Sequence, residues 1–143
     1  MAVFRKVHTK FWQDPKVLEE MTPKDKYFML YLLTNPNTTQ CGIYEITRKQ
    51  IAFEMGYSQE SVNAMMDRFI NIHKLIRYNV ETEELAIKNW GKYNLTRGGK
   101  YMVDCVISEL NEVKDRSLIS YVGENVANKS LKEIFVEVFE NGK

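Results

Sequence analysis

A group of polar side chains in the middle of the sequence has the chemistry needed to bind nucleic acid. Gln59 and Asn63 are four residues apart, and side-chain amides form paired hydrogen bonds with the edge of adenine. Arg68 suits guanine or a phosphate, and the hydroxyls of Ser58 and Ser61 are further hydrogen-bond donors. The group predicts contacts with base edges and phosphates, although Gln59 and Asn63 equally fit ordinary solvent-exposed helix positions.

Basic side chains lie on both sides of this group. Arg48 and Lys49 stand at the expected start of a helix, whose N-terminus itself attracts phosphate. The second basic set follows at Lys88, Lys92, Arg97 and Lys100, in a stretch without acidic residues. This stretch predicts a path for phosphates, or alternatively a solvated connector.

Acidic side chains in the same region point to a different function. Glu60 and Asp67 fall on the outward face of the helix expected to carry Gln59 and Asn63. Glu81, Glu83 and Glu84 cluster at a predicted hairpin tip, where a solvated turn is a better interpretation than a metal site. Since phosphate repels each carboxylate, the alternative is an oligomerisation or protein-interaction module with little affinity for DNA.

Catalytic chemistry finds no support in the sequence. It contains no phosphate-binding loop, dinucleotide fingerprint, zinc-protease motif or nucleophile elbow. Its histidines are His8 and His73, and His73 falls on an apolar helix face, where a core histidine is expected. We therefore predict a protein that is not an enzyme and has no cofactor or metal site.

Composition predicts a globular cytoplasmic protein of one domain plus an appendage. The chain has 143 residues, of which 44% are hydrophobic and 27% charged. It has no apolar run of bilayer-spanning length and no signal peptide, and Cys41 and Cys105 fit free thiols in a reducing compartment. The net charge of +1 divides into +4 for residues 1–102 and −3 for residues 103–143, which predicts different tasks for the two parts.

The elements expected to position the polar group follow from capping and periodicity. Thr22 with Pro23 opens a core helix that ends near residue 35, and a short strand is expected over 41–46. Thr47 and Gln50 fit a capping box, and Gly56 suits the left-handed end of that helix. Ser58 caps a third helix that runs to about residue 74, and so short a connection is typical of a helix-turn-helix.

A hairpin over 75–78 and 84–88 follows the third helix. The order helix, strand, helix, helix, hairpin predicts a mainly α (α+β) fold, a winged helix-turn-helix over residues 22–96. Residues 1–21 form an N-terminal extension, and residues 97–143 form a linker and a helical tail. The tail is expected to contain one or two amphipathic helices, around 103–113 and 131–138 with Ser130 as a possible cap, that dock on the winged helix or on another protomer.

Several runs of the chain resemble the N-terminal domain of phage replisome organisers, the DnaD-like replication proteins of Gram-positive bacteria and their phages. The resemblance covers about residues 4–120 and depends on these runs: 11–14, 21–27, 31–36, 40–46 and 86–93. It implies a replication-initiation protein that binds duplex DNA, forms homo-oligomers and works with host replication or helicase-loading proteins. The second helical domain of that family, with its Tyr-x-x-x-Ile-x-x-x-Trp motif, has no counterpart here. A transcriptional regulator of the same fold is the remaining alternative.

Overall fold

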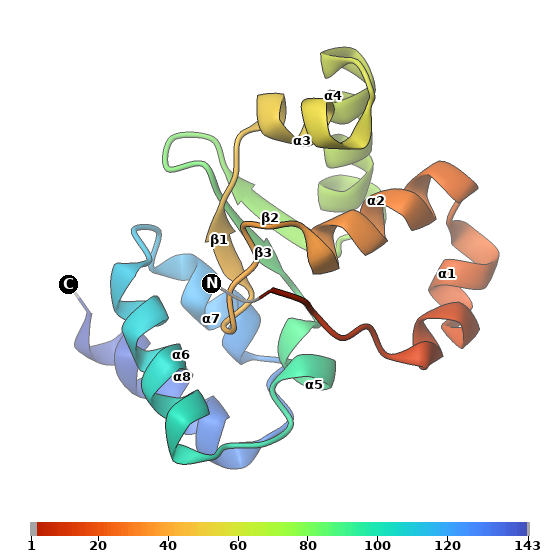
Figure 1. Cartoon of the computed structure of the whole chain (residues 1–143). Coiled ribbons are helices and arrows are strands. Elements are labelled where there is room, and N and C mark those ends of the chain that lie inside the picture. Colours follow the sequence, from red (N-terminus) through yellow and green to blue (C-terminus); the bar gives the residue numbers. More distant parts are fainter. Residues whose placement is uncertain (1–2, 143) are drawn as a thin grey trace.

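The computed structural model describes residues 3–142 and is mainly helical, with one small antiparallel sheet (Figure 1). Two short elements, the 3₁₀-helix η1 and helix α1, precede the first long helix, α2. The elements in chain order are η1 (Thr9–Gln13), α1 (Pro15–Glu20), α2 (Pro23–Thr34), β1 (Ile43–Glu45), α3 (Arg48–Met55), α4 (Gln59–Asp67), the π-helix η2 (Arg68–Ile72), β2 (Ile76–Asn79), β3 (Glu84–Ile87), α5 (Trp90–Asn94), α6 (Lys100–Glu112), α7 (Ser117–Gly123) and α8 (Lys129–Asn141). Across residues 3–142, none of these helices combines the length and apolar character that a membrane span requires.

The start of α2 is fixed as its sequence predicts. The Thr22 hydroxyl accepts from the Asp25 backbone N–H at 3.1 Å, and the Asp25 carboxylate accepts from the Thr22 N–H at 3.4 Å, so the capping box is confirmed. Phe28 and Leu32 are fully buried, which makes α2 a core helix.

The capping box expected at α3 is only half formed. Thr47 accepts from the Gln50 N–H at 3.0 Å, but the Gln50 side chain does not return to Thr47. It pairs instead with the Asn37 amide through two bonds of 2.9 and 3.1 Å. The two amides satisfy a donor and an acceptor on each side, so this pairing ties α3 to the loop after α2 in place of the predicted cap.

The connection between α3 and α4 has the predicted chemistry. Gly56 ends α3 with a φ of 80°, a left-handed conformation that glycine adopts without a steric cost. Ser58 then caps α4 by accepting from the Ser61 N–H at 3.1 Å. The helix expected over 58–74 is not uniform, because it widens into the π-helical turn η2 before ending at His73. His73 is buried, as its place on the apolar face predicts.

The sheet has the strand order β1-β3-β2, with both neighbours antiparallel to β3. The hairpin is confirmed, and β1 is shorter than the 41–46 expected. The prediction for Glu84 was wrong: it does not lie at the hairpin tip but begins β3, where it is buried. Its carboxylate accepts from the backbone N–H groups of Lys114 and Asp115, both at 2.8 Å, because the segment before α7 crosses it and needs an acceptor.

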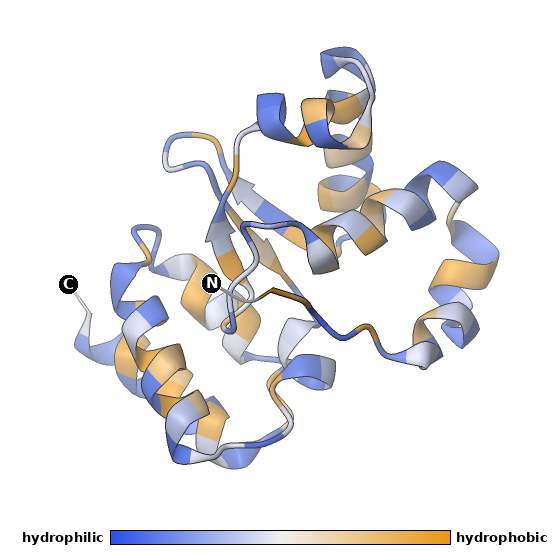
Figure 2. Ribbon diagram, in the orientation of Figure 1, coloured by the Kyte–Doolittle hydropathy of each residue, from blue (hydrophilic) through white to orange (hydrophobic). Residues whose placement is uncertain are grey.

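The C-terminal part contains three helices where one or two were expected. The additional helix, α7, is the most deeply buried of the three and packs against β1 and β3. The helix α8 is capped by Asn128 rather than Ser130, because the Asn128 side chain accepts from the Leu131 N–H at 3.0 Å. The helix α7 thus joins the C-terminal part to the sheet of the same chain, and α8 packs on α7 and α6. Figure 2 shows hydrophobic residues on these helices and on the strands.

The stretch from Lys88 to Lys100, for which a solvated connector was one interpretation, is partly helical. It contains α5, and both Trp90 and Leu95 are buried. The Trp90 indole donates to the Gln40 carbonyl at 2.8 Å, and a Cβ on Gly91 would meet Val126 at 2.6 Å. Close packing on both sides therefore fixes the path between the hairpin and α6.

Candidate nucleic-acid interface

Three elements meet at one set of side chains: the half-buried Arg48 from α3, the exposed Asn63 from α4 and the half-buried Tyr78 from β2. The Arg48 Nη1 donates to Asn63 Oδ1 at 2.9 Å, and its guanidinium carbon lies 5.4 Å from the centroid of the Tyr78 ring. The Tyr78 hydroxyl donates to the Ile46 carbonyl at 2.7 Å. This set, called the Arg48 cluster below, holds a guanidinium in a fixed position between the two helices and the hairpin.

Tyr78 was absent from the residues that the sequence singled out. The signal for it was the two-residue period of a strand, which places Tyr78 on the same face as the buried Ile76 and so toward the helices. Burial and the nearby charge of Glu83 raise the pKa of Tyr78, and the charge of Arg48 opposes them. The phenol therefore remains a hydrogen-bond donor at neutral pH.

The other polar residues predicted on α3 and α4 surround this cluster and differ in their exposure and in the hydrogen bonds that they already form. Lys49 and Gln59 are exposed, and Gln59 is the first residue of α4, where backbone N–H groups face outward. Ser61 is half-buried, and the oxygen of Ser58 already accepts the capping bond. Lys49 and Gln59 are therefore free to contact a ligand, whereas Arg48 and Asn63 are hydrogen-bonded to each other.

Arg68 does not join these residues. Its guanidinium forms an ion pair with Asp25, which is 1% exposed, and His73 Nε2 lies 3.2 Å from the same carboxylate oxygen. Burial alone would raise the pKa of Asp25, but the bonds from Arg68, His73 and the Thr22 backbone together lower it below the usual value. Arg68 therefore neutralises a buried charge between α2 and η2.

The second basic set lies at the opposite end of the sheet. The strand β1 ends at Glu45, beside the first residue of β3, and α3 follows from that end. The helix α5 follows the last residue of β3 and so leaves from the other end, as Figure 1 shows. This second set comprises the half-buried Lys88 and the exposed Lys92, Arg97 and Lys100. The structure therefore divides the predicted DNA contacts into two groups that cannot share one short site.

Acidic residues leave little excess positive charge around the Arg48 cluster. Glu60 and Asp67 are exposed on α4, and Glu81 and Glu83 are exposed at the hairpin tip. Glu45 is paired with Lys114 at 3.1 Å. Binding by this face would depend on placed hydrogen bonds more than on net charge.

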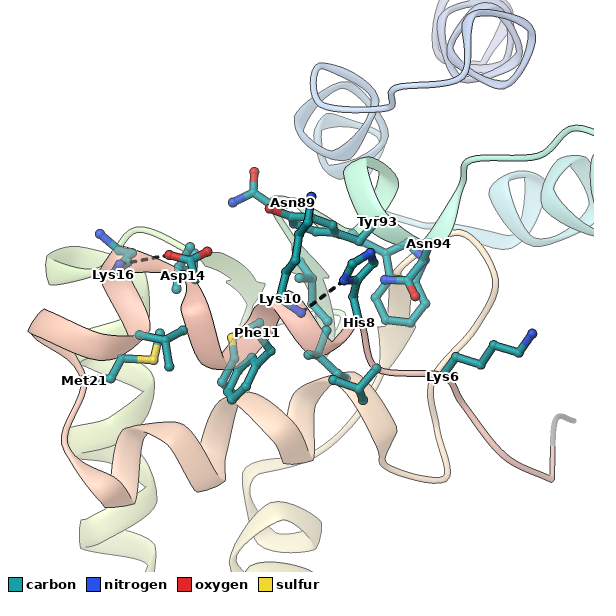
Figure 3. A pocket seen from close by; sticks show the side chains of 17 residues that line it. Lys6, His8, Lys10, Phe11, Asp14, Lys16, Met21, Asn89, Tyr93 and Asn94 are labelled. Carbon is teal, nitrogen blue, oxygen red and sulfur yellow. Dashed lines mark hydrogen bonds between the residues drawn. The ribbon is translucent and has the colours of Figure 1, made fainter.

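A separate cleft opens between the N-terminal segment and α5 (Figure 3). Its volume is about 230 Å³, and its apolar lining includes Phe11, Met29 and Trp90. At its edge the His8 Nδ1 accepts from the Lys10 backbone N–H at 3.1 Å, and the His8 and Tyr93 ring centroids lie 5.8 Å apart. The sequence signal for it was the mixture of basic and aromatic residues over 6–11, within the segment interpreted only as an extension.

Neither the Arg48 cluster nor the cleft has a recognisable catalytic arrangement. The carboxylate that lines the cleft, Asp14, caps α1 by accepting from the Lys16 N–H at 2.9 Å. Within residues 3–142, no three His, Cys, Asp or Glu side chains are placed to hold a metal ion. The chemistry that both sites offer is hydrogen bonding, charge and apolar contact.

Comparisons of the chain with models of protein families, with curated proteins and with solved structures find no match. The resemblance to replisome organisers therefore stays a prediction from the sequence. The chemistry of the chain has to be inferred from its own residues.

Proposed function

We propose that the chain is a DNA-binding replication-initiation protein of the replisome-organiser type, without enzymatic activity. In this proposal residues 22–96 are a winged helix-turn-helix, with α3 and α4 as its two motif helices and the β2–β3 hairpin as its wing. The observation that carries the proposal is the Arg48 cluster, in which the guanidinium of the half-buried Arg48 contacts α4 and the hairpin together. This arrangement suits a surface that meets one ligand with all three elements.

The proposed binding mode places the N-terminal half of α4 in the major groove. Gln59 and Asn63 then reach base edges, while Arg48 and Lys49 contact the flanking phosphates. Because Asn63 Oδ1 already accepts from Arg48, its amide N–H groups remain available as donors. While that bond lasts, Asn63 is suited to acceptors such as purine N7 or guanine O6.

The role in replication is supported by the resembling sequence runs, which lie in η1, α2, β1, β3 and α5 and include residues of the cleft and the sheet, whereas α3 and α4 lie outside them. Partners consistent with that role are duplex DNA, further copies of the chain, and host replication or helicase-loading proteins. A regulator with the same fold would use the same surface on an operator.

A specific observation favours a second candidate function. Glu60 and Asp67 on α4, with Glu81 and Glu83 on the hairpin, place carboxylates around the surface that phosphates would approach. A protein-interaction module with little DNA affinity would account for these carboxylates.

Binding of a fluorescently labelled duplex at two salt concentrations separates the two candidates. With Arg48 and Lys49 as its phosphate contacts, affinity should fall about tenfold between 50 and 200 mM salt, from a slope of roughly −2. The double variant R48A/K49A should lose the salt-dependent part of the affinity for the duplex. The control K129A, at an exposed lysine on α8, should bind as the intact chain does. Absence of binding at 50 mM salt would reject the DNA proposal and favour the second candidate.

A further inference from the structure

We propose that the cleft beside α5 binds the outer face of α8 of a second copy of the chain, so that copies associate head to tail. The inference deepens the self-association included in the proposed function, and it does not require the DNA contacts.

The cleft has room for a large apolar side chain. Its volume of about 230 Å³ exceeds the roughly 150 Å³ that accommodates benzene in an engineered protein cavity. Phe11, Leu33, Leu75 and Trp90 line it, so an inserted aromatic ring would leave water for an apolar surface. The apolar lining predicts a hydrophobic anchor on the occupant.

The surroundings of the cleft are positively charged. Lys6, Lys10 and Lys16 line it, and Lys16 is paired with Glu20 at 3.6 Å. Lys92 lies beside the cleft, with its Nζ 5.3 Å from the centroid of the Tyr93 ring. The carboxylate of the lining, Asp14, caps α1. Within residues 3–142, Lys6, Lys10 and Lys92 have no ion-pair partner, so positive charge remains in excess around the cleft. The occupant should therefore carry carboxylates around its apolar anchor.

The outer face of α8 has this composition. Val136 and Phe139 remain 47% and 40% exposed although the buried side of the same helix already contributes Leu131 and Phe135 to the core. The exposed charged residues of α8 are the acidic Glu133, Glu137 and Glu140 and the basic Lys129 and Lys132, so its carboxylates outnumber its ammonium groups by one. None of them forms an ion pair with another residue of the described chain. The exposed face of α8 therefore combines two apolar side chains with a small excess of negative charge, opposite in sign to the charge around the cleft.

Geometry makes the contact intermolecular. No residue of α8 lines the cleft, and Figure 1 shows α8 on the other side of the molecule from α1 and the N-terminal segment. Two different surfaces then meet in each contact, so the interface is heterologous and a third copy can add at either end. Neither surface includes the Arg48 cluster, which stays available to DNA in every copy.

The test uses light scattering and sedimentation on the full chain over a concentration series. The intact chain should grow beyond a dimer as concentration rises, and added salt should weaken its association. The cleft variant K10E/K92E and the α8 variant E137K/F139S should each weaken self-association at least tenfold. All four positions are exposed, and unchanged melting curves would show that both variants fold. The control variants K24E and Y101S, at an exposed lysine and a 90% exposed tyrosine elsewhere, should associate normally.

Mixing the two defective variants gives the decisive measurement. The cleft variant retains an intact α8 and the α8 variant retains an intact cleft, so the mixture should form a 1:1 dimer that grows no further. If the mixture stays monomeric while the intact chain forms a closed dimer, the head-to-tail arrangement is overturned. If the intact chain stays monomeric at every concentration, the proposal is also overturned, and the cleft would then fit a different acidic partner. DNA binding by the α8 variant should be unchanged on a duplex that fits one copy, because Glu137 and Phe139 belong to neither set of predicted DNA contacts, and this separates the test from that of the DNA surface.

Discussion

Replacing Asp25 with asparagine should destabilise the protein, because Asp25 is the buried charge that joins α2 to η2. Its carboxylate accepts from Arg68, lies 3.2 Å from His73 Nε2 and completes the cap at Thr22. Asparagine keeps the shape and one acceptor oxygen but removes the charge and one acceptor. Arg68 then remains as a cation without a counter-ion at this position.

The size of the effect follows from the burial of the two partners. Removing one partner of a buried ion pair costs about 3–5 kcal/mol. The Arg68 side chain is 39% exposed, so water can stabilise part of its charge, and the asparagine oxygen can still accept from it. We therefore expect D25N to lose about 2–3 kcal/mol of the free energy of unfolding, and roughly 5–10 °C of melting temperature.

The pH dependence gives a second measurement of the same contribution. Burial would raise the pKa of Asp25, but the bonds from Arg68, His73 and the Thr22 N–H together hold it below the usual value of about 3.9. A depressed folded pKa contributes stability that is complete above the unfolded pKa and is lost as pH falls through the folded one. The difference between the intact chain and D25N should therefore be constant from pH 7 to about 5 and shrink below pH 4.

Urea denaturation followed by tryptophan fluorescence at several pH values measures both the stability lost in D25N and the pH dependence of that loss. R68M serves as the partner variant, and the double variant D25N/R68M should lose less than the sum of the two single variants. A loss below about 0.5 kcal/mol in the free energy of unfolding of D25N would refute this account of the contact between α2 and η2. A stability difference between D25N and the intact chain that does not change below pH 4 would also refute it.

Four further predictions concern other parts of the fold. E84A removes the acceptor of two backbone N–H groups before α7 and should cost about 2–4 kcal/mol in urea denaturation, with E84Q intermediate. E83G should raise the free energy of unfolding by about 1 kcal/mol and the melting temperature by a few degrees, because Glu83 has a φ of 59° that glycine adopts more easily. A chain ending at residue 96 should show no cooperative melting by circular dichroism, because it lacks the helix that covers β1 and β3. At pH 8 a thiol reagent should modify the half-buried Cys105 before Cys41, since complete burial raises the pKa of Cys41 to about 12.

The elements with local signals were predictable from the sequence, and those fixed by tertiary contacts were not. Thr22, Gly56 and Ser58 act within a few residues of themselves, so their types alone define the helix ends. The helix α7 has seven residues and is buried on nearly every side, so its sequence lacks the periodic polar face that reveals an amphipathic helix. Its existence depends on the sheet that it covers.

The candidate site was predictable to the same extent. The spacing of Gln59 and Asn63 places both on α4, and capping places Arg48 at the start of α3. Arg68 was predicted to contact guanine or a phosphate, but the wider π-helical turn that begins there and the buried Asp25 bring it inward. Glu84 likewise takes its place from a segment 30 residues further along the chain, a distance over which sequence spacing carries no information.

Self-association through the cleft and α8 would compensate for the weak DNA affinity expected of a single copy. Arg48 and Lys49 are its main cations, and carboxylates at Glu60 and Asp67 oppose them, so one copy should hold DNA weakly. Head-to-tail contacts through the cleft and α8 would leave an Arg48 cluster exposed on each copy and hold neighbouring clusters at a fixed spacing. Binding of a second cluster to the same duplex then becomes intramolecular, which multiplies affinity without any new contact. A long duplex should therefore bind the intact chain much more tightly than a duplex that fits one copy, and K10E/K92E should bind the two duplexes equally.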